Sequence, residues 1–457
     1  MRGTVLPMNN EIEGRRVLVV GAGKSGTAAA RVLAREGARV TITDRRPEEE
    51  LGGSIAALSE GGISWRLGEH RDADFAEADL IVVSPGVPQN LKPLAEAVRR
   101  GIPVVGELEL GFRLFRAPVY AVTGSSGKST TTSLMGEMLK AAGQTIFVGG
   151  NLGTPLCEAV LSETPWDAAV VEVSSFQLET IRTFRPKISA FLNISPNHLD
   201  RYGGMEAYLS AKRRLFENQT AEDFAVLNAA QPVVVECLHT LRARPVLFGI
   251  GEPIEGGVWA AEGGVWSGIG GKTTPLMDIS EIRLPGLHNV ENVLAAAAVA
   301  LLAGANDSDC RGAVRRFEGL PHRLERVRST GGIVFYNDSK ATTVEAMIRS
   351  IQSFDAPVVL IAGGRAKGGD FSLLGRLPEG RLRAAVLIGE AKGLIQGAVK
   401  GTIRVSEAAT IVDAVHQAKS LARPGDVVLL APGCASFDMF PNFEVRGEAF
   451  KEAVRGL

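Results

Sequence analysis

One segment constrains the fold more than any other part of the chain. An apolar stretch at residues 119–123 runs into a loop of small residues, and a helical pattern follows at residues 131–142. A strand, a glycine turn and a helix in this order form a βα unit, whose backbone N–H groups and helix N-terminus attract anions. The sequence therefore predicts a parallel sheet with a phosphate site at this turn.

The loop itself reads Thr-Gly-Ser-Ser-Gly-Lys-Ser-Thr over residues 123–130. Gly124 and Gly127 allow the backbone to turn its N–H groups toward a phosphate, Lys128 can reach the outer phosphates, and the Ser129 hydroxyl can bind Mg²⁺. Val122 stands where the full G-x-x-x-x-G-K-[ST] pattern has its first glycine, so the motif is a shortened form. We interpret the loop as a cradle for nucleotide phosphates.

Length and composition narrow the class of protein. A chain of 457 residues is too long for one hydrophobic core and favours about three domains. The net charge is -1 without a basic tract, so we expect no nucleic-acid partner. The four cysteines are scattered and form no C-x-x-C pair, which fits a reducing cytoplasm.

No stretch of the sequence is typical of a membrane anchor. Residues 1–14 lack the apolar core of a signal peptide, and the longest apolar run, residues 293–305, is rich in alanine and too short to span a bilayer. We expect that run to be a buried helix, and we expect no membrane insertion.

Short apolar strands alternate with helical patterns along nearly the whole chain, which indicates α/β domains with largely parallel sheets. We predict domains at residues 1–110, 111–319 and 320–457. The Gly-rich residues 245–275 favour β-hairpins inserted before a helix that starts near residue 289. Strands are predicted at residues 16–20, 39–43, 80–84, 168–173, 188–194, 224–227, 358–362, 384–388 and 427–431.

The first block holds a second glycine-rich turn, Gly21-x-Gly23-x-x-Gly26, between a predicted strand and a helix. Asp44 ends the next strand 18 residues later. This spacing is typical of dinucleotide sites, where the acid binds a ribose hydroxyl. An NAD-type ligand, another nucleotide diphosphate and a simple packing turn all remain open on this pattern alone.

In a parallel sheet, ligands bind beyond the carboxyl ends of the strands. Glu172 and His198 each follow such an end, so the topology could bring them together with the loop around Mg²⁺ and phosphates. A carboxylate suits Mg²⁺ well, whereas an imidazole is a less usual ligand. Lys212 lies on a predicted helix at residues 205–217, where composition alone favours a solvated lysine.

A series of motifs runs through all three blocks in order. They are residues 21–26, Thr123-Gly-Ser-Ser-Gly-Lys-Ser129, Glu172-Val-Ser-Ser-Phe-Gln-Leu-Glu179, Asn197-His-Leu-Asp-Arg-Tyr202, Leu284-Pro-Gly-Leu-His-Asn-Val-Glu-Asn292, Gly319-Leu-Pro-His-Arg323, Asn337-Asp-Ser-Lys-Ala-Thr342, Cys434-Ala-Ser-Phe-Asp438 and Asn442-Phe443. In this series the chain resembles the Mur ligases, the ATP-dependent amide-forming family of peptidoglycan precursor synthesis. The motifs at 338–342 and 434–443 are similar to those of members that add D-glutamate.

The resemblance implies a fold and a reaction. The fold is a Rossmann-like N-terminal domain that binds a UDP-sugar, a central P-loop ATPase-like domain with a parallel sheet and a small β part, and a Rossmann-like C-terminal domain. The reaction is addition of D-glutamate to UDP-N-acetylmuramoyl-L-alanine through an acyl phosphate, with ATP and Mg²⁺ as cofactors. We expect a cytoplasmic monomer whose partners are these small molecules.

The resemblance also implies roles for individual residues. The catalytic and metal-binding set is Lys128, Ser129, Glu172, His198 and Lys212. The ATP set is Gly124, Ser125, Ser126, Gly127, Lys128, Ser129, Thr130, Asn289, Arg323 and Asp338. The substrate set is Ser25, Asp44, Arg45, Ser84 and Gly86 for the uridine diphosphate, Asn151 for the muramoyl part, and Lys340, Thr342, Lys367, Ser436 and Phe443 for D-glutamate.

Two of these residues need comment. Arg365 and Ala366 precede Lys367, where family members commonly carry an acid before the basic residue, so the chain departs from the family pattern beside Lys367. An ammonium at Lys212 would repel Mg²⁺, whereas a carbamate formed with CO₂ would supply an oxygen ligand. We therefore expect Lys212 to be carbamylated.

Two functions of other classes are alternatives. A nicotinamide-dependent oxidoreductase would use the first block and leave the loop at 123–130 without a role. A P-loop ATPase acting as a binding module would use that loop, and its phosphate release would be indifferent to D-glutamate and the UDP-substrate.

Overall fold

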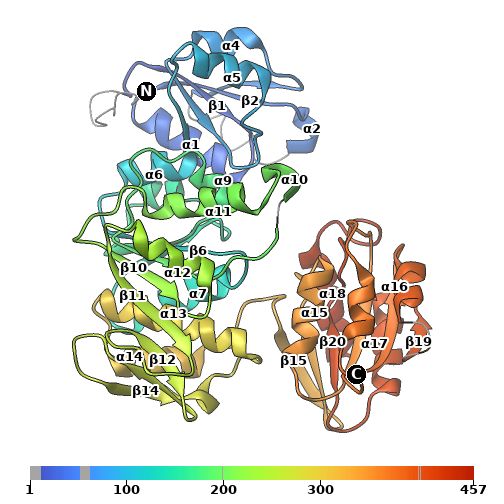
Figure 1. Cartoon of the computed structure of the whole chain (residues 1–457). Coiled ribbons are helices and arrows are strands. Elements are labelled where there is room, and N and C mark those ends of the chain that lie inside the picture. Colours follow the sequence, from blue (N-terminus) through green and yellow to red (C-terminus); the bar gives the residue numbers. More distant parts are fainter. Residues whose placement is uncertain (1–11, 52–61, 198, 400, 402) are drawn as a thin grey trace. The chain divides into compact units, whose positions relative to one another are not determined.

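The protein is presented as a computed structural model that describes residues 12–51, 62–197, 199–399, 401 and 403–457 (Figure 1). Contacts between residues divide the chain into two units. The first contains residues 1–281 and 291–315, and the second contains residues 282–290 and 316–457. The first unit holds two sheets and the second holds one, and all three are mainly parallel.

The first sheet has the strand order β3-β2-β1-β4-β5 and is parallel throughout. Apolar residues of β1 alternate between two packed faces: Val17 and Val19 contact the helix α1 side, while Leu18 and Val20 pack with Phe75 of α4. In Figure 1 the strands accordingly lie between α1 and the pair α4 and α5. The elements are β1 Arg16–Val20, α1 Lys24–Arg35, β2 Arg39–Asp44, α2 Glu48–Leu51, β3 Ser64–Leu67, α4 Asp72–Glu77, β4 Leu80–Val83, α5 Lys92–Arg99 and β5 Val104–Gly106.

Two helices are shared between the first and the middle sheet. On α6 (Glu107–Leu114), Leu110 belongs to the core of the first sheet and Leu108 to the core of the middle sheet. Helix α8 (Leu156–Leu161) also contributes to both cores. The predicted boundary between residues 110 and 111 thus lies inside α6, and this boundary stays a prediction.

The middle sheet has the order β14-β13-β12-β11-β10-β9-β6-β8-β7, which places β6 between β8 and β9. Its strands are β6 Val119–Thr123, β7 Ile146–Gly150, β8 Ala168–Glu172, β9 Ile188–Phe191, β10 Phe224–Asn228, β11 Arg244–Ile250, β12 Val258–Ala261, β13 Gly264–Ser267 and β14 Thr274–Asp278. Its helices are α7 Lys128–Ala141, α9 Ser175–Leu178, α10 Leu199–Tyr202, α11 Met205–Arg213, α12 Pro232–Val235, α13 Leu287–Leu302 and α14 Asp307–Arg316, with short 3-10 turns η2 Arg214–Phe216, η3 Glu236–His239 and η4 Ile279–Glu281.

The hairpins predicted over residues 245–275 are found in part. β13 pairs antiparallel with β12 and with β14, as expected. β11 pairs parallel with β10 and with β12, so it extends the central sheet and is not part of an inserted hairpin. The composition of the segment did not reveal this pairing, because one partner, β10, lies outside the segment and the other, β12, is reached by a short parallel connection that a hairpin pattern does not predict.

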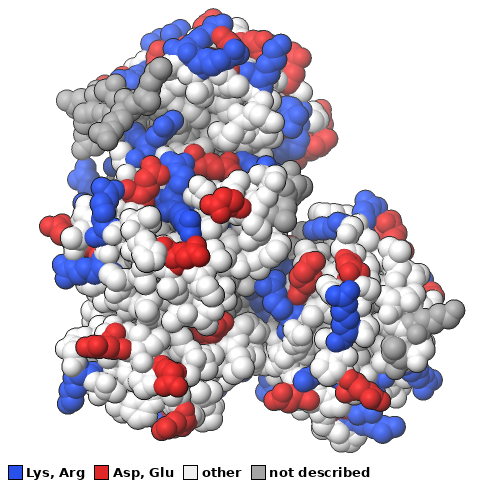
Figure 2. Space-filling model, in the orientation of Figure 1, with Lys and Arg blue, Asp and Glu red and all other residues white. Residues whose placement is uncertain are grey.

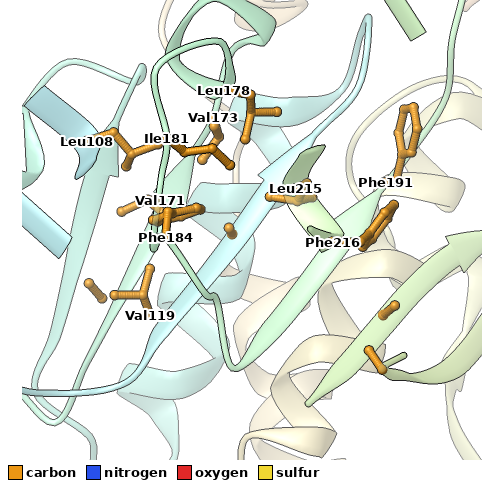
Figure 3. Close-up of a cluster of buried hydrophobic side chains, with 14 of the residues drawn as sticks. Leu108, Val119, Val171, Val173, Leu178, Ile181, Phe184, Phe191, Leu215 and Phe216 are labelled. Atoms are coloured by element: carbon orange, nitrogen blue, oxygen red, sulfur yellow. The ribbon is translucent and has the colours of Figure 1, made fainter. Parts of the chain in front are cut away.

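The core of the middle domain consists of apolar side chains from the strands and from the helices and loops around them (Figure 3). Phe184 is fully buried and meets Phe112 edge to face at a centroid distance of 5.2 Å. On α13, the residues from Val293 to Ala300 are almost completely buried, which confirms the helix predicted for the longest apolar run. Among the described helices, none has the length and apolar character needed to cross a bilayer.

The second unit contains a sheet with the order β15-β16-β20-β17-β18-β19, in which only the β15 pairing is antiparallel among the described strands. Its elements are β15 Glu325–Thr330, β16 Ile333–Asn337, α15 Val344–Gln352, β17 Val358–Gly363, η5 Phe371–Arg376, β18 Leu382–Ile388, α16 Lys392–Ala398, β19 Arg404–Glu407, α17 Ile411–Leu421, β20 Val427–Leu430 and α18 Phe443–Arg455. The boundary predicted between residues 319 and 320 stays a prediction.

Charged side chains of both signs are interspersed over the face of the molecule shown in Figure 2. This distribution agrees with the net charge of -1.

Candidate functional site

The glycine-rich loop predicted to hold phosphates connects β6 to α7. β6 ends at Thr123 and α7 begins at Lys128. Gly127 precedes the helix with a φ of 81°, in the left-handed region that favours glycine. A Cβ at Gly127 would also lie 2.2 Å from Oδ1 of Asn292, so a side chain there would displace the Asn292 amide. The loop therefore has the turn and the helix N-terminus that its sequence predicts.

Two lysines hold the carbonyl groups of this loop. Lys128 Nζ donates to Gly124 O at 3.0 Å and to Ser125 O at 3.2 Å. Lys212 Nζ, from α11, donates to the same Gly124 O at 2.8 Å. The loop thus carries two amino groups at one edge, where negatively charged phosphates would be attracted.

Lys212 is only 1% exposed, so the reading of this residue as a solvated helix lysine is wrong. The inner face of α11 packs toward the loop, and Lys212 also lies 4.8 Å from the ring centroid of Tyr208. Burial lowers the pKa of Lys212 well below its usual value, and the positive charge of Lys128 lowers it further, while Glu172 opposes the shift. These effects favour a neutral amine.

Glu172 ends β8 beside the loop and is 3% exposed. The Ser129 hydroxyl donates to its Oε2 at 2.5 Å, and Asn151 Nδ2 donates to its Oε1 at 2.6 Å. Asn151, which we placed near the muramoyl part of the substrate, therefore contacts the carboxylate of the predicted metal site. A serine hydroxyl and a buried carboxylate together offer the hard oxygen ligands that Mg²⁺ prefers.

The other predicted member of the metal site, His198, lies outside the described residues. Within the described part of the chain, no three His, Cys, Asp or Glu side chains gather at one point. Glu172 and Ser129 could therefore hold a cation only together with further ligands, such as phosphate oxygens.

Asn193, just beyond the end of β9, was missed by our sequence reading. Its Oδ1 accepts hydrogen bonds from Ser125 N at 3.1 Å and Ser126 N at 2.9 Å, and its Nδ2 donates to Ser126 O at 3.2 Å. Its position could have indicated its role. Asn193 follows the carboxyl end of β9, and β9 lies beside β6 in a parallel sheet, so Asn193 reaches the loop that follows β6.

The glycine-rich turn of the first sheet is held by different contacts. A Cβ at Gly26 would lie 1.7 Å from Gly21 O, so only glycine allows α1 to pack against the turn. The Ser84 hydroxyl, from the end of β4, donates to Gly21 O at 3.2 Å. Ser25 lies in the first turn of α1, and Gly86 lies in the loop after β4.

Asp44 connects this turn to the end of β2. Its carboxylate accepts a hydrogen bond from Ala22 N at 2.8 Å and forms an ion pair with Arg46 at 2.8 Å. The neighbouring Arg45 is exposed. Burial by itself would raise the pKa of Asp44, but the hydrogen bonds and charge of Arg46 and the Ala22 N–H outweigh it, so the pKa lies well below its usual range. Asp44 is therefore ionised and already committed to the turn.

The second unit holds the residues predicted for D-glutamate. Lys340 Nζ lies 3.8 Å from the ring centroid of Phe443, which fixes both side chains through a cation–π contact. Ser436 is buried, Thr342 is partly buried and Lys367 is exposed. Arg365, where the chain departs from the family pattern, forms an ion pair with Glu390 at 3.1 Å.

Arg446 was also missed by the sequence reading. It is 1% exposed and donates to Ser339 Oγ, Ser339 O and Cys434 O at 3.0, 2.9 and 3.2 Å. It thus ties the segment that carries Lys340 to the segment that carries Ser436. A lone arginine on a helix gives no such signal, because arginines are usually exposed.

Two residues of the second unit predicted to contact ATP, Arg323 and Asp338, lie beside residues with left-handed backbone. Arg323 stands between His322 (φ 63°) and Leu324 (φ 43°), two left-handed residues. Leu324 N donates to Asp338 Oδ1 at 3.3 Å. Burial raises the pKa of Asp338 to about 6, although hydrogen bonds from Ser350 and Leu324 oppose the shift. Asn289 donates from Nδ2 to Pro285 O at 2.7 Å.

The predicted site residues thus form three groups on three sheets. The structure brings together Lys128, Ser129, Asn151, Glu172 and Lys212 beside the loop of the middle sheet. Ser84 and Asp44 meet the turn of the first sheet, and Lys340 meets Phe443 in the second unit. Such an arrangement can bind a nucleoside triphosphate at one edge, with its charge met by lysines and a cation.

Comparisons with known families agree with this division. Residues 15–106 match the family described as Mur ligase MurD-like, N-terminal domain. Residues 122–300 match the Mur ligase middle domain, and residues 322–434 match the Mur ligase glutamate ligase domain. The three matches follow the three sheets in order.

Curated relatives match over nearly their whole length. A UDP-N-acetylmuramoylalanine–D-glutamate ligase of Geotalea daltonii is 44% identical over 447 residues, covering 98% of both chains. A protein of the same name from Geobacter sp. (strain M21) is 46% identical over 446 residues, covering 97% of this chain and 98% of the relative.

Solved structures share the fold at low identity. A UDP-N-acetylmuramate-alanine ligase of Thermotoga maritima has a TM-score of 0.60 at 19% identity, with 97% of this chain and 99% of that chain covered. A pseudomurein peptide ligase type C from Methanothermus fervidus has the same score and identity, with 97% and 100% covered. With three domain matches and relatives at this level of identity, the chain belongs to the Mur ligase family, among its UDP-N-acetylmuramoylalanine–D-glutamate ligases.

Proposed function

We propose that this chain joins D-glutamate to UDP-N-acetylmuramoyl-L-alanine by an amide bond, in peptidoglycan precursor synthesis, and that ATP hydrolysis to ADP and phosphate drives the reaction. The observation that carries the proposal is the buried contact between Ser129 and Glu172 beside the two lysines, in a chain 44% to 46% identical to ligases of that name. An ATP-dependent ligase needs such a site, because a carboxylate must be activated before an amine can displace its oxygen.

In the first step, an oxygen of the L-alanine carboxylate forms a bond to the γ-phosphorus of ATP, and the bond to ADP breaks. The nitrogen of D-glutamate then attacks the acyl carbon and loses a proton, and phosphate leaves from the tetrahedral intermediate. Negative charge accumulates on the phosphates and the acyl oxygen. Lys128, at the start of α7, is placed to neutralise part of that charge, and its contacts with Gly124 and Ser125 hold it there.

Mur ligases use ATP with Mg²⁺, and the residues beside the loop suit that ion. Ser129 and Glu172 would hold Mg²⁺, because both present oxygen atoms in a buried, hydrogen-bonded pair. The ion would supply charge neutralisation at the phosphates. Asn151 donates to Glu172 and so orients the carboxylate toward Ser129.

We infer that Lys212 acts as a carbamate. Its burial and lowered pKa supply a neutral amine, whose nitrogen can form a bond to the carbon of CO₂ with release of a proton. The product is an oxygen anion beside the loop, a better neighbour for Mg²⁺ than an ammonium.

Carbamylation is tested by adding ¹³C-labelled CO₂ and recording the carbamate carbon signal. We expect a signal in the wild type that is absent in Lys212→Ala, together with nearly complete loss of activity and partial rescue by formate. The control is Lys187→Ala, because Lys187 is about half exposed and pairs with Asp223. A wild-type enzyme that is fully active without a carbamate signal would refute the assignment.

The second unit supplies the proposed D-glutamate pocket. A dicarboxylic amino acid needs cations and hydroxyl groups, which Lys340, Thr342 and Ser436 offer, while Phe443 holds Lys340 in place. Lys367 is exposed and could add a second cation. Lys340→Ala should raise KM for D-glutamate about tenfold or more and leave KM for the UDP-substrate within about twofold. Equal losses for both substrates would contradict this pocket.

The first sheet supplies the proposed site for the uridine diphosphate part, at Ser25, Asp44, Arg45, Ser84 and Gly86. The exposed Arg45 can meet a diphosphate, and the turn of Gly21 and Gly26 offers the N-terminus of α1. Asn289, Arg323 and Asp338 are proposed to contact ATP from the second unit. A monomer in the cytoplasm, where nucleotide substrates are made, is the setting we propose.

The proposed function is tested by measuring phosphate release from ATP while each substrate is omitted in turn. We expect release only when D-glutamate and UDP-N-acetylmuramoyl-L-alanine are both present. Release that is indifferent to both substrates would instead indicate an ATPase module, and binding of NADH in a fluorescence titration would favour an oxidoreductase.

A further inference from the structure

Asn193 holds the first half of the phosphate loop from outside. Its carboxamide oxygen accepts the main-chain N–H groups of Ser125 and Ser126, and its carboxamide nitrogen donates to Ser126 O. The Asn193 side chain therefore forms hydrogen bonds with two N–H groups and one carbonyl group of Ser125 and Ser126. An amide can do both, whereas an ionised carboxylate has no hydrogen to donate.

Ser195, which also follows β9, makes a second set of contacts with the loop. The Ser125 hydroxyl donates to Ser195 O at 3.1 Å, accepts Ser195 N at 2.9 Å and lies 3.2 Å from the Tyr208 hydroxyl. The loop is thus joined to residues 193–195 through main-chain and side-chain atoms. Anions would then meet the N-terminal turn of α7 rather than the N–H groups of Ser125 and Ser126.

A negative charge at position 193 would act on the phosphates that the loop is proposed to hold. Lys128 and Lys212 both donate to Gly124 O, and Glu172 is engaged by Ser129 and Asn151. A carboxylate at position 193 would lie against the loop and repel the phosphates. It would also face Ser126 O with an acceptor.

We propose that Asn193 is a positioning residue for the ATP phosphates, which acts through Ser125 and Ser126 and whose lack of charge is required for ATP binding. This inference rests on the proposed role of residues 124–130 in holding ATP. It predicts that a change of charge at position 193 harms ATP binding more than loss of the side chain.

Two substitutions separate charge from simple support of the loop. Asn193→Asp keeps the size of the side chain and the oxygen that accepts both N–H groups, but adds a negative charge. Asn193→Ala removes the side-chain hydrogen bonds, keeps the main-chain hydrogen bond from Ser125 N to Asn193 O, and adds no charge. If Asn193 served only to stabilise the loop, both changes should lower the melting temperature, because aspartate loses the bond to Ser126 O and alanine loses all the side-chain bonds, and neither loss should depend on salt or on the charge of ATP.

The experiment measures KM for ATP, KM for the UDP-substrate, turnover and melting temperature. We expect Asn193→Asp to raise KM for ATP at least about tenfold, more than Asn193→Ala, with KM for the UDP-substrate within about twofold. Added salt should reduce the effect of aspartate, since salt screens charges. The matched control is Asn218→Asp, because Asn218 Nδ2 likewise donates to main-chain oxygens, those of Arg182 and Phe184. This control should leave KM for ATP within about twofold.

A KM for ATP in Asn193→Asp within about twofold of wild type, or a larger increase in Asn193→Ala, would overturn the proposal. If the aspartate variant does not fold, Asn193→Ser tests the same point. A neutral hydroxyl should keep KM for ATP within about threefold, and an increase of about tenfold would contradict the role of charge. Lys128→Ala tests the ATP site itself. If that variant uses ATP normally, the loop is not the ATP site. If that variant loses activity while Asn193→Asp keeps a normal KM for ATP, only the role of Asn193 is refuted.

Discussion

Glycine-rich turns follow both β1 and β6, and each turn connects a strand to an α-helix. In the first turn, the Asp44 carboxylate accepts a hydrogen bond from Ala22 N and forms an ion pair with Arg46. In the second, Lys128 and Lys212 hold main-chain oxygens, and the neighbouring Glu172 is bound to Ser129. The same backbone pattern can therefore serve two ligands, because the charged residues that reach each turn from neighbouring elements differ.

The glycines also act differently in the two turns. Gly26 is required by packing, since any Cβ would collide with the oxygen of Gly21. Gly127 is required by conformation as well, with its positive φ at the start of α7. The first turn also contains a glycine in a left-handed conformation, Gly21 with a φ of 99°, so the two turns share this conformation and differ in the close packing at Gly26.

The comparison is tested most severely by Lys128→Ala. If the second turn is the ATP site, activity should fall about 10²- to 10³-fold, because a cation at the developing charge is lost. The measurement is phosphate release with both substrates present. Lys140→Ala is the matched control, since Lys140 lies on the same helix but is exposed and pairs with Glu137. Near-normal turnover of a folded Lys128→Ala enzyme would contradict the proposal that the second turn, in contrast to the first, is the ATP site.

The first turn is tested by Asp44→Asn, for which we expect a smaller effect on a different substrate. Loss of the charge frees Arg46 and weakens the contact with Ala22, so KM for the UDP-substrate should rise about tenfold, while KM for ATP stays within about twofold. Asp79→Asn is the control. Asp79 likewise accepts a main-chain N–H and pairs with an arginine, both from Arg16, but at the opposite end of β1. A rise in KM for ATP would show that the two turns serve one ligand.

Much of this pattern could be predicted from the sequence. The strands β1, β6, β8 and β20 begin where the apolar runs begin, and both turns lie where their glycines predict. The burial of Lys212 could not be predicted, because a helix of mixed composition does not reveal which face meets a distant loop. Asn193 and Arg446 were missed for a related reason: each acts through main-chain atoms of segments far away in the sequence.

The smallest expected effect concerns the helix between the two turns. Glu107 begins α6, and its carboxylate accepts Cys157 N at 2.7 Å within the packing of α1, α6 and α8. Burial raises the pKa of Glu107 from 4.5 to about 7, and the charge of Glu158 adds to the rise, while hydrogen bonds from Cys157 and Leu156 oppose it.

The sign of the pH effect follows from this shift. Because the folded protein holds the proton of Glu107 more tightly than the unfolded chain, the stabilisation is complete below pH 4.5 and is lost as the pH rises through about 7. The loss is roughly 3 kcal/mol by the usual conversion of pKa to free energy. Glu107→Gln should therefore reduce the fall in melting temperature between pH 5 and pH 8, and leave both KM values unchanged. An unchanged pH dependence would contradict the assignment.

The central claim is that ATP bound at the second turn activates the L-alanine carboxylate of the UDP-substrate. It is tested most directly with substrate carrying ¹⁸O in that carboxylate. In an acyl phosphate, one carboxylate oxygen bridges carbon and phosphorus and leaves with the phosphate. We therefore predict one ¹⁸O atom in each phosphate released by the wild-type enzyme in the presence of D-glutamate, as measured by mass spectrometry. Released phosphate without the label would contradict the account.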